Sequence, residues 1–321
     1  MKTKTSKSFW LLLIIFIFAL AAFWLLEQTV ASGTESFHLL VRPVFFVWAL
    51  GVYLVQEGLN PVFAKLALHS IGSSTRYWPQ LWITLFSTSA NSTVPVPAGI
   101  PIRVFLQKKI VGVSYTKSSS GVLIETLVGY GATGVAAVVA AYIWLRPVWQ
   151  EFRKQMDVYH HYLSWVLIAV FFVVVFVSFF IWQKRLFFVK WLKEAGGVLV
   201  RARVLPLIGM LLIMLFSFGL ALLRFLFLLW ALDVQAGPGE VMAALLVSRI
   251  AGVLSFVPMG LGVRDASLSS FLVLAGVPLP QAIAAASLDR IVITLPYLVG
   301  GVVASRMLGR SILDGVGVID D

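Results

Sequence analysis

The residues best suited to chemistry are charged side chains in a strongly apolar stretch, residues 257–290. It holds two doublets of an arginine and a carboxylate, Arg264-Asp265 and Asp289-Arg290. Charges at membrane depth are rare unless they line a cavity or face protein. Arginine keeps its charge and can contact a phosphate through two hydrogen bonds. The doublets therefore predict a binding site for an anionic group.

A similar arrangement of helix breakers and charges occurs earlier in the chain. A proline is followed by a glycine two residues later and an arginine four residues after that: Pro97, Gly99 and Arg103, then Pro258, Gly260 (with Gly262 nearby) and Arg264. A Gly-Val pair follows each block, and thirteen residues after that glycine stands Glu125 or Asp289. The spacing predicts two copies of one broken-helix unit, at about residues 78–145 and 240–308, which together build one site.

The composition places these charges in a membrane protein. The chain has 321 residues, of which 60% are hydrophobic and only 12% charged. This predicts an all-α, polytopic membrane protein that forms a single integral membrane domain over residues 1–321, with no soluble domain. The chain has no cysteine, so disulfides, thiolate metal sites and cysteine nucleophiles are excluded. It has no nucleotide-binding or hydrolase motif either, so we expect no cofactor, no metal and no enzyme activity.

The elements that must position the charges are about six full transmembrane helices and two re-entrant units. The expected spans are residues 9–26, 37–56, 118–145, 162–182, 206–232 and 282–304, the first of which could instead be a cleaved signal peptide. The expected re-entrant pieces are residues 82–96 with 100–106, and 241–257 with 266–275. Residues 59–78 are mixed in character and predict a helix at the membrane interface.

The basic residues support one orientation of this arrangement. With the N-terminus inside, the inner segments hold 17 lysines and arginines and the outer segments hold three. Such an excess marks the cytoplasmic side, so we expect a plasma (inner) membrane protein with both termini cytoplasmic. Three full spans between the two broken units make the units enter from opposite faces, as inverted repeats. The net charge of +11 is then explained by topology and anionic lipid, without nucleic acid.

Each candidate site residue also has a structural interpretation. Asp289 and Arg290 could form a salt bridge with each other that braces the last helix. Arg103 could be an ordinary positive charge on the cytoplasmic side of the membrane, and Arg224 could extend to the outer interface. We expect the headgroup site to be centred on the second copy, which holds more of the buried charge. The predicted binding residues are Arg264, Asp265, Arg249, Asp289 and Arg290, with Arg103 and Glu125 opposite.

Two runs of the sequence resemble a known family. The run SRIAGVLSFVPMGLGVRDASLSSFLVLAGVPLPQAIAAASLDRIVITLPYLVGG is similar to the second half of the flippase-like membrane domain of lysylphosphatidylglycerol synthases. The run VPVPAGIPIRVFLQKKIVGVSYTKSSSGVLIET is similar to the first half. The chain departs from the family pattern at Arg264-Asp265, where a glutamate is usual, and at Thr126, where an arginine is usual.

The resemblance implies that the chain moves an aminoacylated or otherwise modified lipid between leaflets. The expected function is therefore translocation of an anionic or modified phospholipid, or of a lipid-linked intermediate. The alternative is a non-transporting accessory subunit of a cell-envelope glycosyltransferase or lipid-modifying system. The expected partners are membrane lipids and, in the alternative, envelope-biosynthesis proteins, while the oligomeric state is left open.

Overall fold

The computed structural model describes residues 42–93, 98–144, 202–255 and 260–313, and these residues belong to one compact unit, Arg42–Asp321. Every regular element among them is helical, which confirms the predicted all-α class for this part of the chain. The first set is α2 (Pro43–Ser70), α3 (Tyr77–Thr93), α4 (Gly99–Leu106), the π-helix η1 (Gln107–Val111) and α5 (Tyr115–Trp144). The second set is α9 (Val204–Ala231), α10 (Pro238–Leu254), α11 (Val263–Leu274) and α12 (Leu279–Leu313).

Three helices in the described part are long and apolar enough to cross a membrane: Tyr115–Trp144, Val204–Ala231 and the Leu279–Gly309 part of α12. They coincide with predicted spans, so the chain is a membrane protein by length and composition. Two other predicted spans, residues 9–26 and 162–182, lie outside the described residues. The count of six spans is therefore still a prediction.

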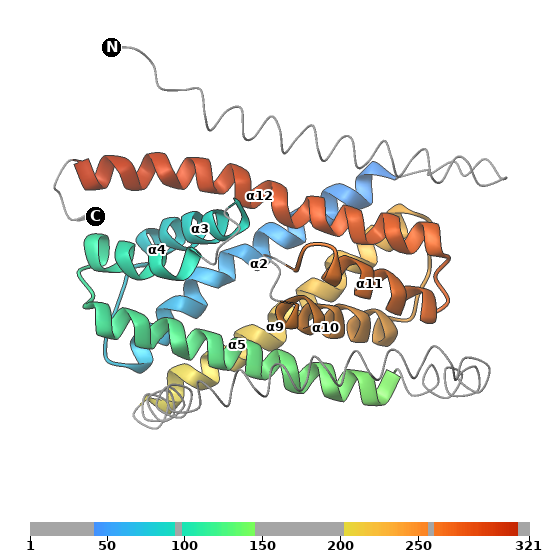
Figure 1. Ribbon diagram of the computed structural model, residues 1–321, viewed down its shortest axis with the longest axis horizontal. Coiled ribbons are helices and arrows are strands. Elements are labelled where there is room, and N and C mark those ends of the chain that lie inside the picture. Colours follow the sequence, from blue (N-terminus) through green and yellow to red (C-terminus); the bar gives the residue numbers. More distant parts are fainter. Residues whose placement is uncertain (1–41, 94–97, 145–201, 256–259, 314–321) are drawn as a thin grey trace, which may run out of the picture. The chain divides into compact units, whose positions relative to one another are not determined.

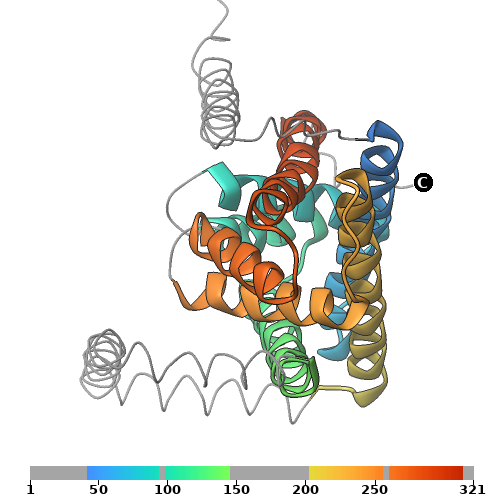
Figure 2. The ribbon, with the colours of Figure 1, turned by 90° about the vertical axis from the view of Figure 1, so that its right-hand side faces the viewer.

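The prediction for residues 37–78 was wrong. It divided this segment into a span and an interfacial helix, whereas α2 runs unbroken from Pro43 to Ser70 and contains Pro61. The physical reason is packing: α2 lies along α9, and their contact is the most extensive between any two described helices. Figure 2 shows the two helices side by side. Tertiary contact of this extent keeps the helix continuous through polar residues and a proline.

The two sets of helices match in length and spacing. Helices α2 and α9 both have 28 residues, α3 and α10 both have 17, and each pair is separated by 161 residues. The first half-helix of each set packs on the long last helix of the other, α3 on α12 and α10 on α5. Figure 1 shows the short pairs α3–α4 and α10–α11 apart from each other, with α2 and α9 crossing between them.

Equivalent helices run in opposite directions. The backbone N–H of Arg42, before α2, donates to the carbonyl of Ala231 at the end of α9 (2.8 Å). The backbone N–H of Arg203, before α9, donates to the carbonyl of Ser70 at the end of α2, also at 2.8 Å. The two donors, Arg42 and Arg203, are 161 residues apart, and so are the two acceptors, Ser70 and Ala231. The second bond is therefore the equivalent of the first with the two sets of helices exchanged. Each bond satisfies a carbonyl that a helix end would leave free.

In both short helix pairs, a glycine lies where the second helix comes too close to the first to leave room for a side chain. A Cβ atom on Gly99 would lie 2.6 Å from the carbonyl oxygen of Ser87 and 2.9 Å from Cβ of Asn91. A Cβ atom on Gly260, whose φ is +63°, would lie 2.7 Å from Cα of Gly252. Gly99 and Asn91 have the same 161-residue offset from Gly260 and Gly252. The predicted breaks thus let each second half-helix return tightly against the first, although Pro97 and Pro258 themselves lie outside the described residues.

We expect Gly260→Ala to destabilise the protein by more than about 1 kcal/mol, because the added methyl group meets backbone and the residue has a positive φ. Unfolding in detergent, followed by helical circular dichroism, measures this effect. The control is Gly219→Ala in α9, where an added Cβ meets nothing within 4 Å. Equal stability of the two variants would show that the backbone at Gly260 can relax freely.

Candidate functional site

The centre of the charged site is Asp289, which is fully buried in α12. One carboxylate oxygen lies 2.7 Å from the guanidinium of Arg224 in α9, and the other accepts a hydrogen bond of 2.7 Å from Arg264 in α11. One carboxylate therefore joins three helices and is shared by two arginines. Two guanidinium charges against one carboxylate leave this cluster with a positive excess.

The remaining residue of each doublet, Asp265 in α11 and Arg290 in α12, pairs with the other. The guanidinium of Arg290 donates to both carboxylate oxygens of Asp265, with Nη2 2.7 Å from each. Asp289 and Arg290 therefore do not pair with each other, as the structural interpretation had it, but each pairs with a residue of α11. Adjacent helical residues point in different directions, so each one pairs with α11, 25 residues away in sequence. The Arg290–Asp265 pair is the more open of the two, since the aspartate side chain is 28% exposed.

The first set of helices repeats one of these contacts. Arg103 of α4 lies 2.8 Å from Glu125 of α5, and both side chains are largely buried. Arg103 and Glu125 are the residues that spacing matches with Arg264 and Asp289. Both predicted counterparts thus form an arginine–carboxylate pair between the second half-helix and the following long helix. Arg103 is therefore not an ordinary solvated charge on the cytoplasmic side, which was the alternative considered for it.

The first short pair is also held by buried amides and hydroxyls. Gln107 donates to Gln80 (3.2 Å) and accepts a short hydrogen bond from Ser118, while Gln80 donates to Thr84 (3.4 Å). At the same 161-residue offset, the second set has the buried apolar residues Val241, Leu245 and Leu268 in place of Gln80, Thr84 and Gln107. The two halves therefore share a frame but differ in their interiors.

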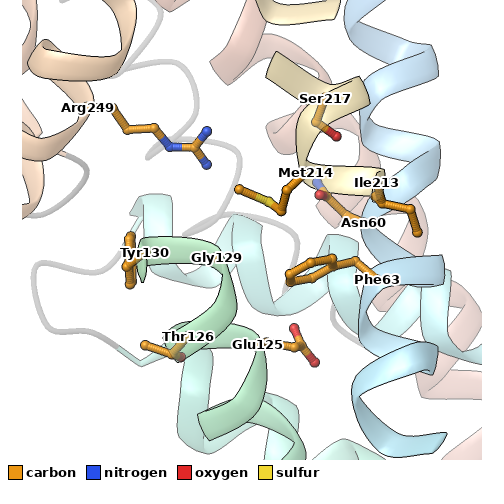
Figure 3. Close-up of a pocket in the computed structure, with 10 residues that line it drawn as sticks. All are labelled: Asn60, Phe63, Glu125, Thr126, Gly129, Tyr130, Ile213, Met214, Ser217 and Arg249. Atoms are coloured by element: carbon orange, nitrogen blue, oxygen red, sulfur yellow. The ribbon is translucent and has the colours of Figure 1, made fainter. Parts of the chain in front are cut away.

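A cavity of about 220 Å³ lies beside these charges, between α2, α5, α9 and α10. Figure 3 shows Arg249 extending towards it from one side and Glu125 lying on another. Its lining mixes polar and apolar side chains: Asn60, Phe63, Glu125, Thr126, Gly129, Tyr130, Ile213, Met214, Ser217 and Arg249. The second carboxylate oxygen of Glu125 has no hydrogen-bond partner among the described residues. The cavity can hold a polar headgroup.

Arg249 differs from the other arginines of the interior. It makes no ion pair or hydrogen bond with any described residue, and its side chain is open to the cavity. It lies within electrostatic range of two further cations, Arg264 and Arg224. An unpaired charge at this depth is costly unless an anion or water compensates it. The arrangement therefore favours a negatively charged ligand next to Arg249.

We compared the sequence with models of known protein families. The family model described as "Lysylphosphatidylglycerol synthase TM region" matches residues 8–301. The chain belongs to this family. A search of the curated proteins found no match to the chain. Membership in the lysylphosphatidylglycerol synthase TM family confirms the resemblance seen in the sequence and indicates a membrane protein in a lipid-related process.

Sequence reasoning missed two charged residues of this family member. Arg224 is not extended to an interface: only 4% of its side chain is exposed, and besides Asp289 it contacts Gln56 (3.0 Å) and the ring face of Tyr53. Glu57 was assigned to a segment outside the spans, yet it lies at the middle of α2. The signal for both was present, because each is a charge inside an otherwise apolar run that one continuous helix would bury.

Gln56 connects this cluster to the cavity. Its amide nitrogen donates to the carbonyl of Ser217 (3.3 Å), a residue of the cavity wall, while its amide oxygen accepts from Arg224. Gln56 and Ser217 are themselves separated by 161 residues, so they are equivalent positions that meet each other. A change at the cavity wall can thus reach Asp289 through a bonded chain.

Proposed function

We propose that this protein is a flippase-like translocase for an anionic or modified phospholipid, or for a lipid-linked intermediate. The observation that carries the proposal is Arg249, a cation that forms no ion pair with the described residues and faces a cavity of headgroup size. Phosphate is the anion common to these lipids, and arginine can bind it through two hydrogen bonds. The positive excess around Asp289 adds long-range attraction for the same charge.

The proposal also gives the matching helix sets a role. We propose that α2–α5 and α9–α12 are inverted repeats whose short helix pairs enter the membrane from opposite faces. What supports this is the 161-residue offset, the antiparallel run of α2 and α9, and the matched pairs Arg103–Glu125 and Arg264–Asp289. Inverted repeats that meet at a central site are a common plan of transporters, because one unit can move against the other.

The proposed setting is the plasma membrane, with both termini and residues 183–205 on the cytoplasmic side, as the distribution of lysine and arginine favours. Single-cysteine labelling tests this cleanly because the chain has no cysteine of its own. A cysteine at position 195 should react with an impermeant maleimide only after the cells are permeabilised. Equal reaction in intact cells would reverse the orientation.

The experiment that tests the function is reconstitution into vesicles of phosphatidylcholine with a trace of headgroup-accessible phosphatidylglycerol. The fraction of phosphatidylglycerol in the outer leaflet is followed by a reagent that cannot cross the membrane. We expect protein-dependent exchange between leaflets, faster than in protein-free vesicles. The same assay is run with the aminoacylated form of phosphatidylglycerol. If neither lipid moves faster than in protein-free vesicles, transport fails as the function and the accessory-subunit alternative takes its place.

A further inference from the structure

Glu57 stands apart from the other carboxylates of the interior. It lies at the middle of α2, where its carboxylate accepts hydrogen bonds from the hydroxyl of Tyr297 (2.6 Å) and the amide of Asn60 (2.9 Å). Both donors are neutral. Glu57 forms no ion pair with any described residue, whereas Glu125, Asp265 and Asp289 each hold an arginine at 2.7–2.8 Å.

This difference decides which carboxylate can take up a proton at low cost. Protonating Asp289 would leave Arg224 and Arg264 without their shared counter-charge, at a cost of several kcal/mol. Protonating Glu57 breaks no salt bridge. The hydroxyl of Tyr297 can accept from a carboxylic acid as readily as it donates to a carboxylate, and the amide of Asn60 can still donate.

The surroundings of Glu57 connect it to both water and charge. Asn60 lines the cavity and donates to Glu57, so the carboxylate lies one hydrogen bond behind the cavity wall. Ionisable side chains reach this region from each helix packed on α2: Tyr77 from α3, Glu125 from α5, Arg224 from α9 and Tyr297 from α12. Arg224 interacts electrostatically with Glu57 while it is bonded to Asp289.

The charge of the cavity region then depends on Glu57. Arg224, Arg249 and Arg264 face the single carboxylate Asp289 and, when it is ionised, Glu57 as well. An added proton raises the local charge by one. An anionic headgroup beside Arg249 is therefore held more tightly when Glu57 is protonated, and by linkage the bound headgroup favours uptake of the proton.

We propose that Glu57 is a coupling site for a proton that binds together with the anionic headgroup. The inference rests on the proposed translocase function. A proton from one aqueous side converts the Glu57 carboxylate to the acid as the headgroup enters the cavity, and the proton leaves to the other side as the headgroup departs. Intramembrane carboxylates without an ion pair are typical of proton relays in transporters.

The test compares wild type with Glu57→Gln, which imitates the protonated acid. Thermal stabilisation by short-chain phosphatidylglycerol in detergent reports binding. For wild type, we expect the apparent affinity to weaken about fivefold or more as pH rises from about 5 to about 8. Glu57→Gln should bind at every pH about as tightly as wild type does at low pH. In vesicles, a proton gradient should accelerate lipid movement by wild type and not by the variant.

The matched control is Asp233→Asn, which neutralises an exposed acid just beyond the end of α9, whose side chain is 72% exposed. It should keep the pH dependence of wild type. A wild-type affinity that does not change with pH, or a Glu57→Gln variant with the same pH dependence as wild type, would overturn the proton site while leaving lipid transport intact. Absence of any lipid movement by wild type would instead count against the proposed function itself.

Discussion

Replacing Asp289 by asparagine should lower the free energy of unfolding by about 3–5 kcal/mol, the usual effect of removing one partner from a buried ion pair. Asparagine has the same shape, so the loss comes from charge. Arg224 and Arg264 would be left together, with no carboxylate between them, in a site where Asp289 is fully buried. Chemical unfolding in detergent, followed by tryptophan fluorescence, measures the change.

Two further variants separate this explanation from a general intolerance of substitution. Asp265→Asn breaks the more exposed pair with Arg290, so its effect should be clearly smaller. Adding Arg224→Met to Asp289→Asn should recover part of the loss, because it removes one of the two uncompensated cations. A double variant that is no more stable than Asp289→Asn alone would show that repulsion between the arginines is not the cause.

Replacing Arg249 by methionine should have the opposite profile. The variant should be as stable as wild type or more stable without lipid, because it removes a charge that makes no ion pair with a described residue. Lipid movement and lipid-dependent stabilisation should fall at least about tenfold, since charge-assisted hydrogen bonds to a phosphate contribute about 1.5–3 kcal/mol. Arg249→Lys should recover only part of the response, because lysine cannot reproduce the bidentate contact.

The matched control for Arg249 is Arg306→Met, which removes an exposed arginine near the end of α12. It should leave both the lipid response and the stability near wild type. An Arg249→Met protein that moves lipid at the normal rate would remove Arg249 from the headgroup site. The pair Arg264–Asp289 would then be the next candidate for the headgroup site. If variants of that pair also moved lipid at the normal rate, the accessory-subunit alternative would be favoured.

The predicted binding role of Arg264 now takes a different form. Its guanidinium bonds to Asp289, so it is engaged in a structural contact as the protein stands. A phosphate contact from Arg264 would require this bond to be shared or exchanged. Arg249, which needs no such exchange, is the stronger candidate for first contact with the headgroup, and Arg264 and Asp265 stay predicted site residues.

Much of the local structure was determined by the sequence. Apolar runs of sufficient length specify α5, α9 and α12, because a long and predominantly apolar segment is stable in a membrane as a helix that satisfies its own backbone hydrogen bonds. Glycine in the two break motifs specifies where each short pair turns back. The thirteen-residue spacing from Gly112 to Glu125 and from Gly276 to Asp289 was also visible in the sequence. In each set the structure pairs this carboxylate with the arginine that follows the break, Arg103 or Arg264.

Only the tertiary structure decided which charges meet. Arg224 and Asp289 are 65 residues apart in sequence, and Glu57 and Tyr297 are 240 residues apart, so no local spacing relates them. The neighbours Asp289 and Arg290 could not be assigned to each other or to α11 before the packing of α11 on α12 was known. Polar residues such as Lys65 and His69 suggested an interfacial helix, but contact with α9 keeps α2 continuous while these two side chains stay exposed. Long-range packing, which local pattern does not encode, thus selected the ion pairs and, within the part of the chain that the structure describes, left Arg249 and Glu57 without one.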